Sequence, residues 1–346
     1  MAQHVLITGG AGFIGSALAD RLAAEGNHVL VLDTLARAGA ADNLAWLRRR
    51  HPRHIAVAHG DIRDGAVVAD CVAGTAGVFH LAAQAAVSVG RSAPLEDFEI
   101  NLRGTVLLLD ALRRRGDAVP LVFAGTTKVY GDLADIPLDL CDDGWQPADT
   151  ALRAAGVDER RRLDFHTPHG CSKGAADQYV LDAARSFGLP SVVLRMSTIY
   201  GMRQCGTPDQ GWLTHFLLAA MTGGGITLYG DGHQVRDLMF VDDAVDTCLA
   251  AWRRAGDLAG RAFNLGGGPD NAVSLLQLVG TIERLLGRPV ARRMAPARAD
   301  DRRWFVTDAR AARAALDLPA PLPWRQGLAR LAAWADGAQG RAVRAA

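Results

Sequence analysis

The chain has 346 residues, 49% of them hydrophobic and 22% charged, and a formal net charge of +1. This composition is typical of a soluble globular protein with a sizeable core, and it lacks the basic surface that binding to nucleic acid or to an acidic membrane requires. No apolar run is long enough for a bilayer, no signal peptide precedes the first strand-like residues, and five scattered cysteines form no CxxC or Cys/His cluster, so we expect a cytoplasmic protein with reduced thiols and no metal.

Short β-branched runs alternate with helical patterns through the first half of the chain. Strands are expected at His4–Thr8, His28–Asp33, His54–Ala58, Gly77–His80 and Val119–Ala124, and helices at Phe13–Glu25 and Ile100–Arg115. In the second helix, Leu102, Val106, Leu109 and Arg113 recur at helical spacing and predict its mainly apolar face. The alternation predicts an α/β fold with a Rossmann-like, doubly wound parallel sheet.

The second half of the chain has a different organisation. A long polar segment from Gly131 to Pro168 follows the fifth strand, and loops of that length are usually functional or disordered. A helix from about His169 to Phe187 and a strand at Ser191–Arg195 come next. Shorter, glycine-rich pieces beyond Gly201 predict a smaller second domain. We expect a dinucleotide-binding domain at residues 1–195 with a contribution from about 234–262, a substrate-binding domain at 196–233 and 263–337, and a loose tail at 338–346.

The turn after the first strand reads TGGAGFIG. Gly9, Gly12 and Gly15 permit a tight turn, the close approach of a pyrophosphate and close helix–strand packing, and the next helix presents its N-terminus to the phosphates. Asp33 ends the second strand, where a carboxylate can accept hydrogen bonds from the adenosine ribose and would repel a 2′-phosphate. The pattern favours NAD over NADP, although Arg37 nearby could neutralise an additional phosphate.

Further motifs extend over essentially the whole chain. They are GDIRD at Gly60–Asp64, HLAAQ at His80–Gln84, TKVYG at Thr127–Gly131, YGDG at Tyr229–Gly232, Arg236-Asp237, FNLG at Phe263–Gly266, and the single residues Arg298, Asp301 and Asp308. Together with the glycine turn they resemble extended short-chain dehydrogenases/reductases, the NAD-dependent epimerase/dehydratase family. Within it, DFHTPHGCSKG from Asp164, IYGMRQ from Ile199 and DQGW from Asp209 are similar to the CDP-paratose (CDP-tyvelose) 2-epimerases.

The resemblance implies a tightly held NAD that oxidises a sugar carbon, and a keto intermediate that is reduced from the opposite face. The family's catalytic residues are a Ser or Thr, a Tyr and a Lys, with the last two spaced as YxxxK on one helical face. Here Thr126 and Lys173 match, whereas His169 occupies the tyrosine position. The lysine orients the ribose and, with the nicotinamide, lowers the pKa of the acid/base group.

The histidine leaves more than one interpretation open. An imidazole has an ordinary pKa of about 6.5, and neighbouring positive charge lowers it, so the neutral ring can abstract a hydroxyl proton at physiological pH. Imidazole is shorter than phenol, however. His169 is therefore either the proton acceptor or a helix-capping residue in a site that has lost its redox chemistry, and an altered reaction is a third possibility.

The resemblance also implies binding residues. Those for the cofactor are Gly9, Gly12, Phe13, Ile14, Gly15, Asp33, Asp61, Ile62, Leu81, Ala82, Ala83, Gln84 and Lys173, and those for the substrate are Lys128, Thr198, Arg236, Arg298 and Asp301. Arg236 and Arg298 would clamp the diphosphate, because a guanidinium suits two phosphate oxygens, or they form ordinary surface ion pairs. Lys128 and Gln84 border the pocket or are turn residues. Cys171 is expected to be buried.

We therefore predict an NAD-dependent nucleotide-sugar epimerase, and specifically a CDP-sugar 2-epimerase. A dehydratase or decarboxylase on the same scaffold is the first alternative, disfavoured because Thr126-Thr127-Lys128 has no carboxylate pair for eliminating water. A redox-inactive protein that binds NAD or a nucleotide sugar is the second. The family also implies a homodimer through the helices near Ile100–Arg115 and His169–Phe187, and we expect neither a nucleic-acid partner nor a membrane.

Overall fold

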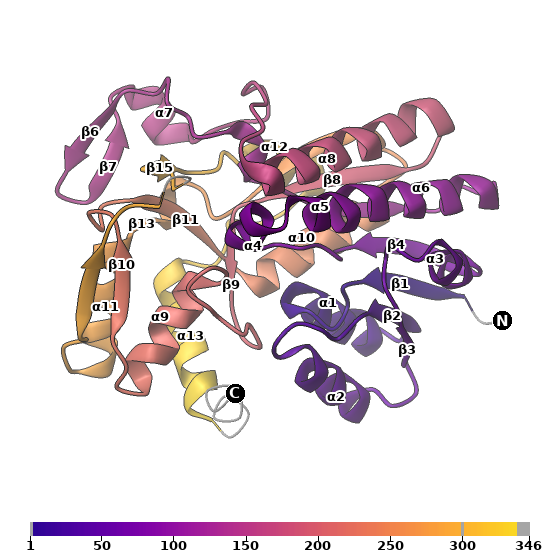
Figure 1. Ribbon diagram of the computed structural model, residues 1–346, viewed down its shortest axis with the longest axis horizontal. Helices are drawn as coiled ribbons and strands as arrows, with labels where there is room; N and C mark the ends of the chain where they lie inside the picture. Colours follow the sequence, from indigo (N-terminus) through magenta and orange to yellow (C-terminus); the bar gives the residue numbers. More distant parts are fainter. Residues whose placement is uncertain (1–2, 299–300, 338–346) are drawn as a thin grey trace. The chain divides into compact units, whose positions relative to one another are not determined.

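The computed structural model describes residues 3–298 and 301–337, which form two compact units (Figure 1). The first contains the described residues up to Val129, together with Phe165–Arg195 and Ala244–Phe263. The second contains Tyr130–Asp164, Met196–Asp243 and the described residues from Asn264 onward. The tail expected at 338–346 lies outside the described residues. Within the described ranges, no helix has both the length and the apolar composition needed to cross a bilayer.

A seven-stranded sheet forms the centre of the first unit. Its strands, in spatial order, are β12 (Arg261–Leu265), β8 (Ser191–Met196), β5 (Leu121–Thr126), β4 (Thr75–His80), β1 (His4–Thr8), β2 (Val29–Asp33) and β3 (Ile55–His59). β1 pairs in parallel with both β2 and β4, so the winding direction reverses between β1 and β4. This order confirms the predicted doubly wound sheet, and it places the ligand crevice expected of such sheets at the carboxyl ends of β1 and β4.

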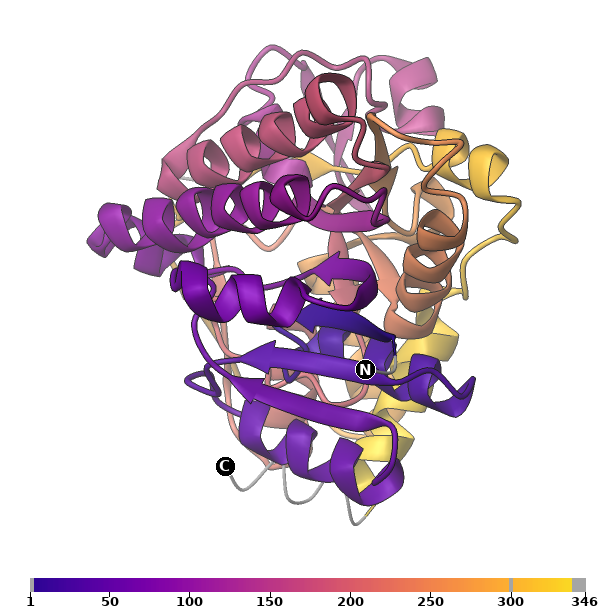
Figure 2. The same ribbon diagram turned by 90° about the vertical axis from the view of Figure 1, so that its right-hand side faces the viewer.

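Helices cover both faces of this sheet (Figures 1 and 2). α1 (Phe13–Ala24) and α2 (Ala40–Arg50) lie on one face, and α6 (Gly104–Arg115) and α8 (Thr167–Phe187) lie on the other. The remaining helices of this unit are α3 (Gly65–Val72), α4 (Val87–Ser92) and α5 (Pro94–Asp97), together with most of α10 (Val241–Arg253). The strands are apolar on both sides because helices pack against both.

The helix predicted at Ile100–Arg115 differs from expectation. Its first part is a π-helix, η1 (Phe98–Arg103), which continues as α6. The buried residues of α6 are Gly104, Thr105, Leu108, Leu109 and Leu112. The predicted stripe shares only Leu109 with this face, because the buried face of α6 is centred one residue earlier, on Thr105, Leu108 and Leu112.

A buried ion pair joins α8 to the sheet. Arg195 on β8 donates from Nε to Asp177 Oδ2 at 2.8 Å and from Nη2 to Oδ1 at 3.0 Å. The two side chains are only 5% and 0% exposed. This bidentate pair holds α8 against β8. α8 carries two of the predicted catalytic residues.

The second unit has short sheets and mostly short helices. Its strands are β6 (Leu138–Cys141), β7 (Gly144–Pro147), β9 (Thr198–Tyr200), β10 (Ile226–Tyr229), β11 (Val235–Phe240), β13 (Ala272–Ser274), β14 (Arg292–Ala295) and β15 (Trp304–Phe305). Its helices are α7 (Thr150–Ala155), α9 (Trp212–Met221), α11 (Leu275–Leu286), α12 (Arg310–Leu316) and α13 (Trp324–Asp336), with 3-10 turns η2 (Thr127–Tyr130), which begins in the first unit, and η3 (Pro269–Asn271). β11 is its hub, because it pairs with β9, β13 and β15.

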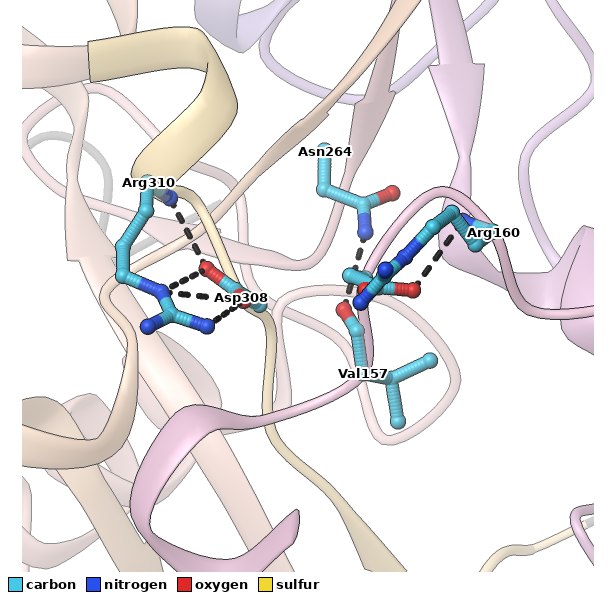
Figure 3. Close-up of polar contacts among 6 residues, drawn as sticks. Val157, Arg160, Asn264, Asp308 and Arg310 are labelled. Carbon is cyan, nitrogen blue, oxygen red and sulfur yellow. Dashed lines mark hydrogen bonds and ion pairs between the residues drawn. The ribbon is translucent and has the colours of Figure 1, made fainter. Parts of the chain in front are cut away.

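The long loop expected from Gly131 to Pro168 is wrong. The segment contains the β6–β7 hairpin and α7, whose N-cap Asp149 accepts hydrogen bonds from the second and third helical amides. It is tied to the rest of the unit by a bridge between Val157 and Thr307 and by Asn264, whose Nδ2 donates to the Val157 carbonyl at 2.9 Å (Figure 3). The hairpin was hard to foresee because its strands have four residues each and little apolar alternation.

Candidate active site

The glycine turn after β1 has no room for side chains. Gly9 has a φ of +70°, and a Cβ there would lie 2.8 Å from the Ala82 backbone nitrogen. A Cβ on Gly15 would lie 2.3 Å from the Gly9 carbonyl oxygen. α1 then begins at Phe13 without a side-chain cap, so its first amides have no intrahelical or side-chain partner. This bare, positively polarised helix start fits the pyrophosphate of a dinucleotide.

Asp33 lies at the end of β2 and contacts the same turn. Its Oδ2 accepts a hydrogen bond from the Ala11 amide at 3.0 Å, and its Oδ1 accepts one from the Leu35 amide at 2.9 Å. The carboxylate is therefore held beside the glycine turn by two backbone donors. One carboxylate oxygen can accept further hydrogen bonds from a ribose, since each has two lone pairs.

We expect Asp33→Ser to weaken NADH binding about 10- to 100-fold and to narrow the preference over NADPH, because charge-assisted hydrogen bonds contribute about 1.5–3 kcal/mol. Titration of both cofactors by their fluorescence measures the two dissociation constants. Asp42→Ser, an exposed acid in the first turn of α2, is the matched control and should leave both unchanged. Equal NADH affinity in Asp33→Ser and the parent protein contradicts the assignment.

The other predicted cofactor residues lie along the same sheet edge. Leu81, Ala82, Ala83 and Gln84 follow β4 directly, and the Ala82 amide donates to Thr8 Oγ1 at 3.2 Å. The side chains of two further predicted cofactor residues, Asp61 and Ile62, have partners within the protein. The Asp61 carboxylate is bound by the Arg63 guanidinium, which lowers its pKa, and the Ile62 side chain lies in the hydrophobic core.

His80 ends β4 and is fully buried between two threonines. Thr105 Oγ1 donates to the Asn101 carbonyl at 2.6 Å, so it accepts from His80 Nε2 at 2.9 Å. Thr8 Oγ1 donates to Nδ1 at 2.7 Å. Burial, with a smaller effect of the Lys173 charge, lowers the pKa of His80 to about 3. The ring is therefore a neutral linker between the glycine turn and α6.

This buried neutral ring predicts acid sensitivity. A lowered folded-state pKa gives stability that is complete above the ordinary histidine pKa of 6.5 and is lost as the pH falls towards about 3. The loss approaches roughly 5 kcal/mol at the acid limit, at about 1.4 kcal/mol for each pH unit. Urea unfolding at a series of pH values should show this slope in the parent protein and a flatter one in His80→Gln. The exposed His59→Gln is the control, and identical slopes in His80→Gln and the parent contradict the prediction.

The three predicted catalytic residues come from neighbouring elements of the first unit. Thr126 ends β5, and His169 and Lys173 lie one helical turn apart near the start of α8. The Lys173 ammonium is buried and lies 4.1 Å from the centroid of the Phe123 ring on β5. Burial lowers the pKa of Lys173 to about 7, against the opposing effects of Asp177 and Asp97. Thr167, two residues before His169, has a φ of +65°, a strained conformation of the kind that concentrates at active sites.

His169 is buried, with one ring nitrogen bonded to backbone. Its Nδ1 lies 3.1 Å from the Gln84 carbonyl oxygen. Burial first, and then the charges of Lys173 and Lys128, lower the pKa of His169 to about 4, although the bond to Gln84 opposes them. The ring is therefore neutral at physiological pH and can accept a proton. Lys128 itself follows Thr126 closely, and its amide donates to Thr126 Oγ1 at 3.2 Å.

The structure also reveals residues that the motifs did not indicate. Three of them are buried and form hydrogen bonds near Gln84: Asp97, Asn101 and Ser172. Asp97 and Asn101 bond to Gln84 directly, and Ser172 bonds to both of them. Asp97 and Asn101 precede α6 in a stretch with no recognised motif. The only signal in the sequence is their spacing of four, which places both on one face of a helix. Cys171, by contrast, is exposed, and the expectation of a buried thiol is wrong because it projects from the solvent side of α8.

The predicted substrate residues apart from Lys128 belong to the second unit. Arg236 Nη2 lies 2.5 Å from both Asp301 Oδ1 and the Arg302 carbonyl oxygen, so two of the predicted residues are bound to each other. Arg298 pairs with Asp209 at 3.0 Å, and its guanidinium lies 4.0 Å from the centroid of the Tyr229 ring. Thr198 begins β9 beside β11. Both arginines thus have carboxylate partners that an incoming anion can replace.

Comparison with known proteins agrees with this architecture. Residues 5–266 match the model of the NAD dependent epimerase/dehydratase family. The chain is 38% identical to the CDP-paratose 2-epimerase of Salmonella typhi, over 96% of this chain and 99% of that protein, and 34% identical to the dTDP-glucose 4,6-dehydratase of Streptomyces griseus, over 96% and 94%. It superposes on the UDP-glucose 4-epimerase of Thermus thermophilus in complex with NAD with a TM-score of 0.80 and 29% identity, over 97% and 100% of the two chains. The chain belongs to the NAD-dependent epimerase/dehydratase family of nucleotide-sugar enzymes, and the comparisons confirm the family and the NAD cofactor that its motifs predict.

Proposed function

We propose that this protein is a CDP-sugar 2-epimerase in which His169 takes the role of the family tyrosine. The observation that carries the proposal is the 38% identity, over nearly the full length of both chains, to a protein named CDP-paratose 2-epimerase. Thr126 at the end of β5 and the buried Lys173 on α8 support it, because both match the family's catalytic residues although the tyrosine between them in the motif order is replaced by His169. The first unit would bind NAD and the second the nucleotide sugar.

Each residue has a specific part in the proposed reaction. NAD, when bound beside the glycine turn and Asp33, would supply the hydride acceptor and donor for the sugar carbon. Thr126 hydrogen-bonds the reacting hydroxyl, and neutral His169 removes its proton as the hydride leaves and returns the proton when the carbon is reduced on the other face. Lys173 orients the ribose, and burial together with the Lys173 charge lowers the pKa of His169 and keeps the imidazole in the neutral form that the first step requires.

Substrate capture would use the second unit. The Arg236 and Arg298 guanidiniums exchange their present carboxylate partners, Asp301 and Asp209, for the diphosphate oxygens. Asp301 is then free to accept hydrogen bonds from the nucleotide ribose. Lys128 would lie next to the sugar, and Thr198 would contribute from the start of β9.

We also propose a cytoplasmic homodimer. Leu95, Phe98, Tyr179 and Phe187 on α5, η1 and α8 are 71%, 45%, 53% and 55% exposed, and they lie on or next to the helices through which the family resemblance implies a dimer. Light scattering after gel filtration should give twice the chain mass. Leu95→Asp with Phe98→Asp should shift it to the chain mass, whereas Leu285→Asp, at an exposed leucine on α11, should not. A monomeric parent protein contradicts the dimer.

The decisive test of the activity is product analysis. The protein and NAD are incubated with CDP-, UDP-, GDP- and dTDP-sugars, and the products are examined by NMR and mass spectrometry. Inversion of C2 in a CDP-sugar without a mass change supports the proposal. A loss of water or carbon dioxide would identify a dehydratase or decarboxylase. Sugars that bind and return unaltered would identify a redox-inactive binding protein.

A further inference from the structure

A closed ring of buried hydrogen bonds surrounds the backbone of Gln84 in the first unit. The Gln84 amide donates to Asn101 Oδ1 at 2.8 Å, and Asn101 Nδ2 donates back to the Gln84 carbonyl at 3.0 Å. The two backbone groups thereby determine the orientation of the Asn101 amide, because an N–H can only donate and a carbonyl can only accept. Asn101 itself is fully buried in the π-helix η1.

The same carbonyl determines which nitrogen of His169 carries a proton. The Gln84 oxygen lies 3.1 Å from His169 Nδ1, and it has no proton to give. Nδ1 must therefore be the donor in this bond, and a neutral ring has only one N–H. The lone pair that can accept a proton is consequently on Nε2.

A buried carboxylate completes the ring. Asn101 Nδ2 also donates to Ser172 Oγ at 3.0 Å, so the Ser172 hydroxyl turns its proton towards Asp97 Oδ2 and the His169 carbonyl, each at 3.3 Å. Gln84 Nε2 donates to Asp97 Oδ1 at 2.8 Å. Asp97 is fully buried, and its two carboxylate oxygens accept hydrogen bonds from Gln84 and Ser172. The ring thus runs from Asp97 through Ser172 and Asn101 to Gln84, whose carbonyl contacts the imidazole, and the donors of Asn101 and Gln84 have determined directions.

We propose that Asp97, Asn101 and Ser172 are positioning residues that hold His169 in the Nδ1–H tautomer and so make Nε2 its proton-accepting atom. The tautomer follows from the hydrogen bonds alone, whereas its use in catalysis rests on the proposed function. None of the three touches the sugar in this scheme. They act by keeping the Gln84 carbonyl aimed at the ring, and a catalytic imidazole held in the wrong tautomer loses most of its activity.

The test is ¹⁵N NMR of the full-length protein labelled at histidine, with NAD bound and His169 assigned by difference from His169→Gln. Nitrogen shifts and long-range couplings distinguish an N–H nitrogen from a bare one. We expect a protonated Nδ1 and a bare Nε2 in the parent protein. Asn101→Ala should bring the two His169 shifts towards each other as the tautomers mix, and the milder Ser172→Ala should change them in the same direction. Ser186→Ala, at an exposed hydroxyl on the same helix, should leave them unchanged.

Turnover adds an independent measurement. With the CDP-sugar, Asn101→Ala should lower kcat about 10- to 100-fold and change KM little, because a positioning defect removes transition-state stabilisation rather than substrate binding. A parent protein with the proton on Nε2, or His169 shifts that remain the same in both Asn101→Ala and Ser172→Ala, overturns the inference. A parent protein with a protonated Nδ1 that converts no sugar contradicts the proposed function and leaves the positioning role supported.

Discussion

Replacing His169 by alanine should lower kcat for epimerisation about 100- to 10,000-fold, which is the usual contribution of a general base. KM should stay within a few-fold, since the diphosphate and the nucleotide are bound by groups of the second unit in the proposed scheme. Initial rates followed by NMR over a range of substrate concentrations separate the two constants. Added imidazole should restore part of the rate, because the substitution leaves a hole of its shape beside the Gln84 carbonyl.

Two control measurements distinguish a loss of catalysis from a loss of folded structure. Cys171→Ala changes an exposed neighbour on the same helical turn and should keep turnover within about twofold, as ordinary surface substitutions have little effect. The melting temperature of His169→Ala should show that the fold is intact. If His169→Ala retains full turnover, the histidine is not the base, and the family position has lost its role in this chain.

Arg195→Met should lower the free energy of unfolding by about 3–5 kcal/mol, because it leaves the Asp177 carboxylate buried without its partner. The pair is bidentate and almost completely shielded from water, so no solvent replaces the lost guanidinium. Urea unfolding followed by circular dichroism measures the difference. Activity should fall as well, because the ion pair between Arg195 and Asp177 holds α8, which carries His169 and Lys173, against the sheet.

The double variant Asp177→Leu with Arg195→Met provides the critical comparison. Removing both charges leaves no uncompensated ion, so the double variant should recover most of the lost stability. Arg21→Met breaks an exposed ion pair with Asp246 and should cost less than about 1 kcal/mol. An Arg195→Met protein as stable as Arg21→Met would show that the buried pair contributes no net stability.

Much of the first unit could be predicted from the sequence because its signals are local. An apolar run of five residues followed by a glycine turn specifies a buried strand and a βα connection without reference to the rest of the chain. The predicted strands therefore lie within two residues of β1 to β5, and β5 begins later than expected because Pro120 precedes it and cannot donate to the sheet. His169 and Lys173 were assigned from a local signal as well, the resemblance of their segment to the family's YxxxK motif.

The features that were missed depend on contacts between distant segments. Nothing near Asp97 shows that its carboxylate meets Ser172, because the two are 75 positions apart. The π-helical turn has no simple sequence signature, so a regular α-helix was expected from Ile100 onward. In the β6–β7 hairpin, β7 also packs beside β11, β13 and β15, which lie far away in the sequence and which pattern analysis cannot detect.

The π-helix before α6 determines the number of residues in the segment between α5 and α6. A turn of this kind holds one residue more than an α-helix would need, and each helical residue is worth about 100° of rotation about the axis. Deleting one residue within Phe98–Arg103 would return the turn to α-helical width, so Asp97 and Thr105 would keep their faces on either side of it, whereas Asn101 inside the turn would lose its place opposite Gln84. The additional residue of the π-helix thus serves the hydrogen bonds of Asn101 rather than the packing of α6, and a chain one residue shorter in this turn would keep its fold but lose the contact between Asn101 and the Gln84 backbone.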